Sequence, residues 1–172
     1  EKIAQLLSGI PGVTMPNTAR CMANSPKELM ATADILNFKF PFIVRKAGDH
    51  GGVSMVLVRG PSDFDRLHVF PFASTPFYLT QFVEYGDDNG HYQKQRIVFV
   101  DGQPLARHAI TGDSWNVHAI SRRDQEGAPP GEEELQNTNR LQSQLIPSAK
   151  PALTEIAKRI KLDLFGLDCH IN

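Results

Sequence analysis

The chain has 172 residues, of which 41% are hydrophobic and 22% are charged. This composition is typical of a globular protein and excludes collagen, a coiled coil and a disordered chain, while the length allows one domain or one domain of two lobes. The 18 Lys and Arg residues nearly balance the 19 Asp and Glu residues, which leaves a formal charge of −1. We therefore expect no nucleic acid and no membrane partner, because neither would meet an overall positive field.

The two cysteines, Cys21 and Cys169, lie far apart and have neither the spacing of a metal site nor that of a disulfide framework. A reducing, cytoplasmic location is the expectation. No apolar run approaches the ~20 residues that cross a bilayer. Residues 167–172 have the pattern of a strand that is just beginning, so we expect the chain to be part of a longer protein.

The first half of the chain alternates helix and strand signals. Ser25 to Glu28 has the spacing of a capping box with proline at the first helical position, and it predicts a helix to about Ile35. Leu29, Ala33 and Leu36 would share one face of that helix. Strands are predicted at 40–44, 53–58 and 77–83, and Ser62 is expected to cap a short helix through Leu67.

The second half carries a strong hairpin signal. Asp101-Gly102 stands between apolar runs at 96–100 and 104–110. Residues 122–131 predict a long exposed loop that could serve as a lid, residues 148–161 an amphipathic helix and residues 164–171 a last strand. Hairpins and interspersed helices indicate an α+β protein with antiparallel sheets.

A glycine-rich segment follows the strand at 40–44 and carries the first functional signal. Glycines at 48, 51 and 52 permit close backbone approach and leave N–H groups free to point at an anion. Arg45 and Lys46 add positive charge at the end of the preceding strand, a combination that suits a nucleoside triphosphate. The segment is neither a Walker A motif nor a dinucleotide fingerprint, and the alternative is a plain flexible hairpin.

Two further segments have both a functional and a structural interpretation. Residues 79–85 form an apolar strand that leads into a polar loop, which is either a structural element or a hinge whose backbone reads a purine edge. Lys94 and Arg96 lie two residues apart, so in a strand they share a face. They either meet an anion there or simply face water.

The last strand and the Trp115 segment complete the candidates. Alternation places Asp168 and His170 on one face and Leu167, Cys169 and Ile171 on the other. A hard cation such as Mg²⁺ would suit Asp168, and the alternative is that Asp168 faces solvent. In residues 114–118, strand alternation would place Asn116 with His118 toward a phosphate or substrate; the alternative is a core tryptophan with polar neighbours.

The order of these motifs resembles the ATP-grasp superfamily. The matching segments are 45–55, 81–83, 96–102 and 166–168, and the likeness covers the chain from about Gly12 onward. It is most similar to prokaryotic glutathione synthetase and to the ligases that add glutamate to ribosomal protein. The chain also looks like the ATP-grasp domains of unknown substrate that follow tetratricopeptide repeats in bacterial proteins. The resemblance implies two α+β lobes, at about 12–80 and 81–172, with ATP in a cleft between them.

The resemblance also implies residue roles. The loop from Gly48 to Ser54 would close over the phosphates, and Arg45 stands where glutathione synthetase has its phosphate-binding lysine. Lys46 stands where the superfamily usually has proline, which makes it the weaker candidate. The backbone of Phe82 and Val83 would read adenine. The implied ATP-binding residues are Arg45, Lys46, Gly48, His50, Gly51, Gly52, Ser54, Gln81, Phe82, Val83, Glu84, Asp88, Lys94 and Asn116.

In the second lobe, Asp168 would be the first Mg²⁺ ligand and Arg96 would contact phosphate or an acyl phosphate. Glu84 or Asp88 could hold the ribose. The candidate catalytic residues are Arg96 and His118. The remaining metal ligands, a Glu and an Asn of a Glu-x-Asn segment, are expected beyond residue 172.

The implied reaction is activation of a carboxylate by ATP to an acyl phosphate, which an amine or thiol then attacks. The carboxylate could belong to a small molecule, a peptide or a protein. Two alternatives stay open at this point. The domain could bind nucleotide without catalysing a reaction, which the change from lysine to Arg45 would favour, or it could keep the fold only as a protein-interaction module.

Overall fold

The computed structural model describes residues 2–49, 54–73, 75–117 and 131–172. The protein is α+β, and every strand pair in the described part is antiparallel, as the hairpin signals predicted. The chain divides into two compact units, one of residues 1–5 and 15–84 and the other of residues 6–14 and 85–172. The short helix α1 (Lys2–Leu7) contains the first division point.

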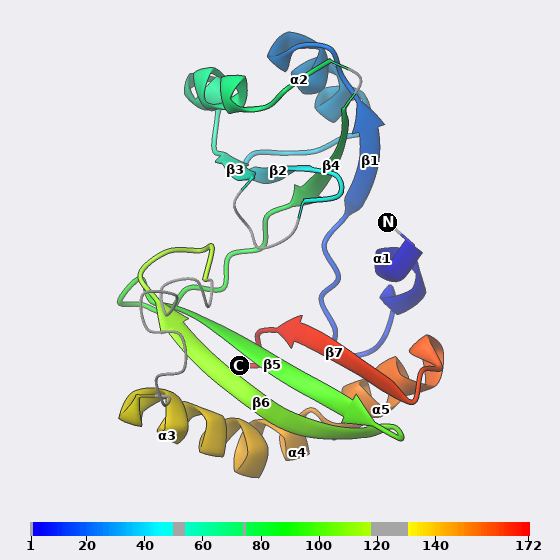
Figure 1. Ribbon diagram of the computed structural model, residues 1–172, viewed down its shortest axis with the longest axis vertical. Helices are drawn as coiled ribbons and strands as arrows, with labels where there is room; N and C mark the ends of the chain where they lie inside the picture. Colours follow the sequence, from blue (N-terminus) through cyan, green and yellow to red (C-terminus); the bar gives the residue numbers. More distant parts are fainter. Residues whose placement is uncertain (1, 50–53, 74, 118–130) are drawn as a thin grey trace. The chain divides into compact units, whose positions relative to one another are not determined.

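The first unit contains a four-stranded sheet in the order β1-β4-β2-β3 (Figure 1). Its elements are β1 (Thr18–Met22), α2 (Pro26–Ile35), β2 (Phe42–Lys46), β3 (Met55–Val58), the 3₁₀ helix η1 (Pro61–Val69) and β4 (Pro76–Gln81). The predicted strand at 40–44 begins only at Phe42, because Pro41 has no N–H to give to a ladder. The short helix expected at Ser62 is η1, which follows Gly60 and has no side-chain cap.

Local capping explains why α2 was predictable. The Ser25 hydroxyl accepts the N–H of Glu28 at 3.1 Å, and the Glu28 carboxylate accepts the N–H of Asn24 at 2.9 Å. Leu29 and Ala33 are buried as expected. The prediction for Leu36 was wrong: the helix ends at Ile35, and Leu36 is the cap residue and 37% exposed.

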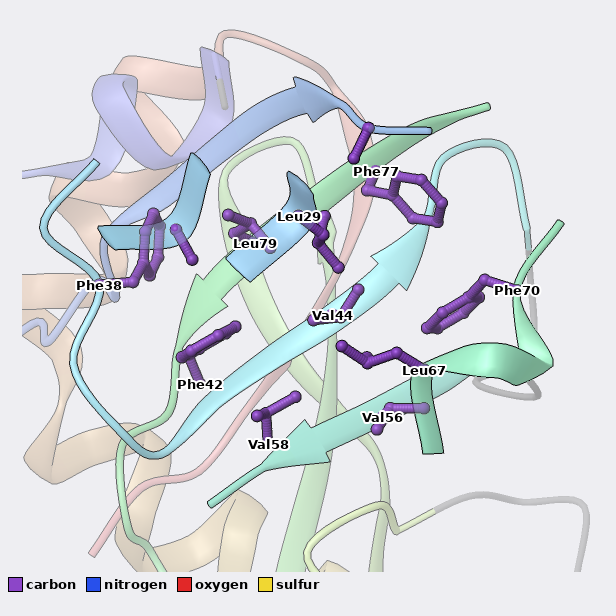
Figure 2. Packing of buried hydrophobic residues seen from close by; sticks show 12 residues of the cluster. Leu29, Phe38, Phe42, Val44, Val56, Val58, Leu67, Phe70, Phe77 and Leu79 are labelled. Carbon is purple, nitrogen blue, oxygen red and sulfur yellow. The ribbon is translucent and has the colours of Figure 1, made fainter. Parts of the chain in front are cut away.

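The core of the first unit lies on one face of its sheet. Figure 2 shows apolar side chains from α2, η1 and the strands converging on this face. The labelled residues are Leu29, Phe38, Phe42, Val44, Val56, Val58, Leu67, Phe70, Phe77 and Leu79. The alternate residues of β2, Ile43 and Arg45, therefore point to the opposite face, which we call the open face of the first sheet.

The second unit contains a three-stranded sheet in the order β6-β5-β7, with helices along one side (Figure 1). Its elements are β5 (Tyr92–Val100), β6 (Gln103–Gly112), α3 (Glu132–Arg140), the π-helical turn η3 (Leu141–Leu145), α4 (Ile146–Ser148), α5 (Lys150–Ile160) and β7 (Leu164–Cys169). The predicted hairpin turn is confirmed: Asp101 and Gly102 have φ of 48° and 76°.

The helical side of this sheet is buried, and its other side is partly exposed. Ile97 and Phe99 are fully buried, and the ring of Phe99 stacks on Phe165 with centroids 4.4 Å apart. The residues that alternate with them along β5, including Lys94 and Arg96, point to the other side, which we call the open face of the second sheet. None of the helices in the described ranges is long and apolar enough to cross a membrane.

Several local expectations do not hold. Residues 113–116 form bends after the end of β6, so the strand alternation expected around Trp115 does not apply, and Trp115 itself is only half-buried. The prediction missed α1, β1 and α3. The exposed loop expected at 122–131 falls outside the described residues except for Gly131.

Candidate functional site

Arg45 is the phosphate-binding candidate in the first unit. It is exposed on the open face of the first sheet, opposite Tyr78 of β4. Its guanidinium carbon lies 5.4 Å from the centroid of the Tyr78 ring, within the range of a cation–π contact. This contact holds the cation close to the sheet surface while leaving its N–H groups available.

Asp49, in the segment after β2, contacts two of the predicted ATP-binding residues, Lys46 and Ser54. The Asp49 carboxylate lies 3.5 Å from the Lys46 ammonium and accepts a hydrogen bond from the Ser54 hydroxyl. Gly48 has φ of +86°, and a Cβ at this position would meet no atom within 4 Å. Lys46 and Ser54, both expected to bind ATP, are therefore held by a carboxylate that the sequence reasoning passed over. His50, Gly51 and Gly52 lie outside the described residues.

The hinge candidate lies at the other end of β2 and β4. The side-chain amide of Gln81 donates to the carbonyl oxygens of Lys39 and Pro41, both at 2.8 Å, and accepts the N–H of Lys39 at 3.1 Å. The N–H of Phe82 donates to Pro41 at 3.2 Å. Gln81 thus holds the segment that leads into β2. Val83 is 41% exposed. Its backbone forms no hydrogen bond within the described part of the chain.

The two ribose candidates, Glu84 and Asp88, are both exposed. Their neighbour Asp87 organises this loop: its carboxylate accepts the N–H of Asn89 at 2.9 Å and that of His91 at 2.8 Å. The hydrogen bond from the His91 backbone is the main cause that lowers the pKa of Asp87. Asp87 is a turn residue, which leaves Glu84 and Asp88 as the open alternatives.

Arg96 and Asp168 meet on the open face of the second sheet. They are opposite each other on β5 and β7, and Arg96 Nη1 donates to Asp168 Oδ1 at 2.8 Å. Both side chains are close to half exposed, at 40% and 46%. Lys94 projects from β5 on the same face, which confirms the predicted sharing of a face by Lys94 and Arg96. The structure thus brings three of the predicted residues to one surface.

Gly166 makes room for this pair. A Cβ built at Gly166 would lie 2.7 Å from Arg96 Cζ, far inside contact distance. The guanidinium therefore lies directly over the glycine backbone. The sequence motif around Asp168 contained this glycine, but its relation to Arg96 depends on strand register and could not be predicted locally.

The Asp168 carboxylate fits a magnesium ion as a single protein ligand. In the described part of the chain, its Oδ1 accepts a hydrogen bond from Arg96, and Oδ2 accepts none. The described residues contain no group of three or more His, Cys, Asp and Glu side chains that could hold a metal ion. Magnesium commonly uses one or two carboxylates together with substrate phosphates and water, so Asp168 suits that role only alongside a bound nucleotide.

The thiol of Cys169 lies next to Asp168 along β7. Burial is the main cause that raises the pKa of Cys169 to about 12, and the negative charge of Asp168 adds to it. A raised pKa favours the neutral thiol at physiological pH, which is a weak nucleophile.

Aromatic contacts hold the segment that contains Asn116. The Tyr85 hydroxyl donates to the carbonyl oxygen of Trp115, and the Tyr85 ring lies 5.0 Å from Tyr92 and 5.5 Å from the ring of His170. Asn116 is half-buried beside this cluster, and His118 falls outside the described residues.

Gln95 is a buried polar residue that the sequence reasoning missed. Its side chain is fully buried, donates to the Ile171 carbonyl at 3.2 Å and accepts the Ile171 N–H. This pairing extends the contact of β5 with the chain just beyond β7. Only its position in an apolar strand, where a polar side chain needs a partner, could have drawn attention to it.

No family model and no curated protein matches the chain, whereas solved structures match its fold. The ADP complex of PurK, an N5-carboxyaminoimidazole ribonucleotide synthetase, matches 97% of this chain and 38% of its own with a TM-score of 0.55 and 14% identity. A carboxyaminoimidazole ribonucleotide synthase from Aspergillus clavatus, complexed with ATP, matches 96% and 39% with a TM-score of 0.54 and 13% identity. The D-alanine–D-alanine ligase of Bacillus anthracis matches 99% and 52% with a TM-score of 0.53 and 12% identity.

These proteins have the ATP-grasp fold, and the chain has the same fold, as the resemblance in its motifs predicted. The chain spans between 38% and 52% of the length of these three proteins. At 12–14% identity the likeness defines the fold, and the chemistry of this chain has to be argued from its own residues.

Proposed function

We propose that the chain is the ATP- and Mg²⁺-binding part of a ligase that joins a carboxylate to an amine or thiol through an acyl phosphate. The observation that carries this proposal is the Arg96–Asp168 pair on the open face of the second sheet, in a chain with the ATP-grasp fold. In this proposal the arginine would bind phosphoryl oxygens, and the adjacent carboxylate would bind the metal that accompanies them.

The first unit would bind the nucleotide along β2. The exposed backbone of Val83 would read the adenine at one end of the strand, and Glu84 or Asp88 would hold the ribose. Arg45 and the hairpin from Gly48 to Ser54 would hold the phosphates at the other end. The five residues of β2 span roughly 13 Å between these ends, at a rise of about 3.3 Å per residue.

The second unit would neutralise the charge that develops during transfer. Mg²⁺, when bound, would supply charge neutralisation at the phosphate oxygens. Asp168 would hold it through the carboxylate oxygen that Arg96 leaves open. Lys94 and Arg96 would donate to the phosphoryl oxygens and orient the acyl phosphate, since positioning and electrostatic stabilisation account for most of the catalysis of phosphoryl transfer.

The finer assignments remain predictions. They include a glutathione synthetase-like subgroup, an association with tetratricopeptide repeats, a cytoplasmic location and a peptide or protein as the carboxylate substrate. The participation of His50, Gly51, Gly52, Asn116 and His118 is likewise predicted from the motifs.

A thermal-shift titration of the 172-residue chain with ATP tests the proposal. Saturation to 100 times Kd should add about 2.7 kcal/mol to the free energy of unfolding, and the gain should be larger with Mg²⁺ than without it. If ATP raises the free energy of unfolding equally with and without Mg²⁺, the result would instead favour a nucleotide-binding domain without metal chemistry. The absence of any rise would favour the interaction-module alternative.

A further inference from the structure

A second arginine, Arg20, shares the open face of the first sheet with Arg45. Strand β1 pairs with β4 so that Arg20 is opposite Tyr78, and β2 pairs with the other edge of β4 so that Arg45 is also opposite Tyr78. Residues directly opposite each other in a sheet point to the same side. The three side chains therefore form a row across the sheet, with the tyrosine in the middle.

The two cations of this row are exposed, and the described residues place no compensating charge against them. Two strand spacings separate their backbones, which corresponds to roughly 10 Å. Arg45 lies over the Tyr78 ring, and among the described residues no carboxylate forms an ion pair with Arg20 or Arg45. Like charges held on one surface repel each other, and a bound anion would remove that repulsion.

The row has a defined position in the unit. Strands β1 and β2 are both antiparallel to β4 and so run in the same direction, which places Arg20 and Arg45 toward the end of the sheet where the hairpin after β2 begins. The adjoining row on the same face consists of uncharged residues, namely Thr18, Thr80, Ile43 and Leu57. Positive charge is therefore concentrated in one row, next to the glycine-rich segment.

We propose that Arg20, Tyr78 and Arg45 form one anion-binding platform that takes a polyphosphate chain. The planar guanidinium group donates two parallel hydrogen bonds to phosphate oxygens, and two such groups on one surface can hold neighbouring phosphates. Tyr78 positions Arg45 through the ring contact. The identification of the ligand as ATP rests on the proposed function, whereas affinity for the polyphosphate follows from the platform alone.

The test is calorimetric titration of the 172-residue chain with tripolyphosphate and, separately, with ATP. Arg20→Gln and Arg45→Gln should each weaken tripolyphosphate binding by about tenfold, because each removes one charged donor pair. Arg20→Lys keeps the charge but loses the planar guanidinium that donates two parallel hydrogen bonds. Its affinity for tripolyphosphate should fall between those of the wild type and Arg20→Gln.

Lys27→Gln is the matched control. Lys27 is exposed on α2, which packs against the buried face of the same sheet, so this variant removes one positive charge away from the platform. Its affinity for tripolyphosphate should change by less than about twofold, since exposed charges at a distance are screened by salt. Thermal melts of all variants confirm that they are folded.

The outcomes separate this inference from the proposed function. An Arg20→Gln variant that binds tripolyphosphate as tightly as Lys27→Gln does would overturn the platform, even if ATP binding depends on Arg45. Tripolyphosphate binding that depends on both arginines, without ATP binding, would support the platform and contradict the proposed function. A wild-type chain that binds neither probe would overturn both.

Discussion

Gly166 of β7 leaves the space that the side chain of Arg96 on the neighbouring strand β5 occupies. The guanidinium of Arg96 occupies the space that any side chain at position 166 would need, and this position lets it reach Asp168. The φ of Gly166 is outside the left-handed region, so the glycine serves to leave space rather than to permit a strained backbone. We infer that the glycine is required for the position of Arg96 more than for folding.

Gly166→Ala should therefore impair function more than stability. The added Cβ would displace the Arg96 guanidinium, which can move into solvent at a cost in stability below about 1 kcal/mol, typical of an exposed substitution. The affinity for Mg²⁺-ATP should fall by about tenfold if one charge-assisted contact is lost. Calorimetric titration and a urea melt measure the two effects. A large loss of stability with unchanged affinity would contradict this account.

The carboxyl group of Asp63 has a pKa that folding lowers, and this shift can be measured. The backbone N–H of Arg59 donates to its carboxylate at 2.7 Å, and this hydrogen bond is the largest cause that lowers the pKa of Asp63 from 3.8. Because the pKa is lowered by folding, the stabilisation is present above pH 3.8 and is lost as the pH falls through the folded-state pKa.

Carbon-detected NMR titration should place the midpoint of Asp63 below 3.8. Arg66→Gln serves as the control, since the Arg66 side chain makes a smaller contribution than the backbone hydrogen bond and the pKa should stay lowered. A midpoint at or above 3.8 in the wild-type chain would contradict the assigned hydrogen bond.

At the scale of elements, the first unit depends on the apolar face of its sheet. Leu79 of β4 is fully buried among the residues shown in Figure 2, whereas Leu164 of β7 is 67% exposed. Leu79→Ala should lower the free energy of unfolding by about 2–5 kcal/mol, because it removes apolar contacts and leaves a cavity.

Leu164→Ala makes the same chemical change at an exposed position and should cost within about 0.5 kcal/mol. Denaturant melts of the two variants provide the comparison. Equal losses of stability would mean that the burial of the two leucines does not distinguish their roles.

The elements that could be predicted are those with complete local signals. The helix α2 has its cap at Ser25, and the hairpin of β5 and β6 has its turn at Asp101-Gly102. The edge strand β1 and the helix α3 were not predicted: β1 has five residues, and Leu135 is the one apolar residue of α3, so neither shows a repeat of apolar residues.

The candidate site was predictable as a set of residue types and only partly as a geometry. The alternation of β5 placed Lys94 and Arg96 on one face, and this prediction is confirmed. The pairing of Arg96 with Asp168, 72 residues apart, and the use of the Gln81 amide to hold Lys39 and Pro41 depend on register and on long-range contacts. Periodicity along one strand contains no information about either.

At the scale of the whole molecule, the fold and the charge distribution support different parts of the account. The ATP-grasp fold relates the chain to proteins of 12–14% identity, too distant to transfer a substrate. The net charge of −1 gives no general attraction for a polyanion. The proposed nucleotide affinity would therefore have to arise locally, at Arg45 in the first unit and at the Arg96–Asp168 pair in the second.

The proposed function requires that this chain bind ATP together with Mg²⁺ through Asp168. The most direct measurement is calorimetric titration of ATP into the wild-type chain and into Asp168→Asn, each with and without Mg²⁺. We predict that Mg²⁺ tightens ATP binding to the wild-type chain and has little effect on the variant, whose amide is a poorer magnesium ligand than a carboxylate. Equal Mg²⁺ dependence in both proteins, or no ATP binding to the wild-type chain, would contradict the account.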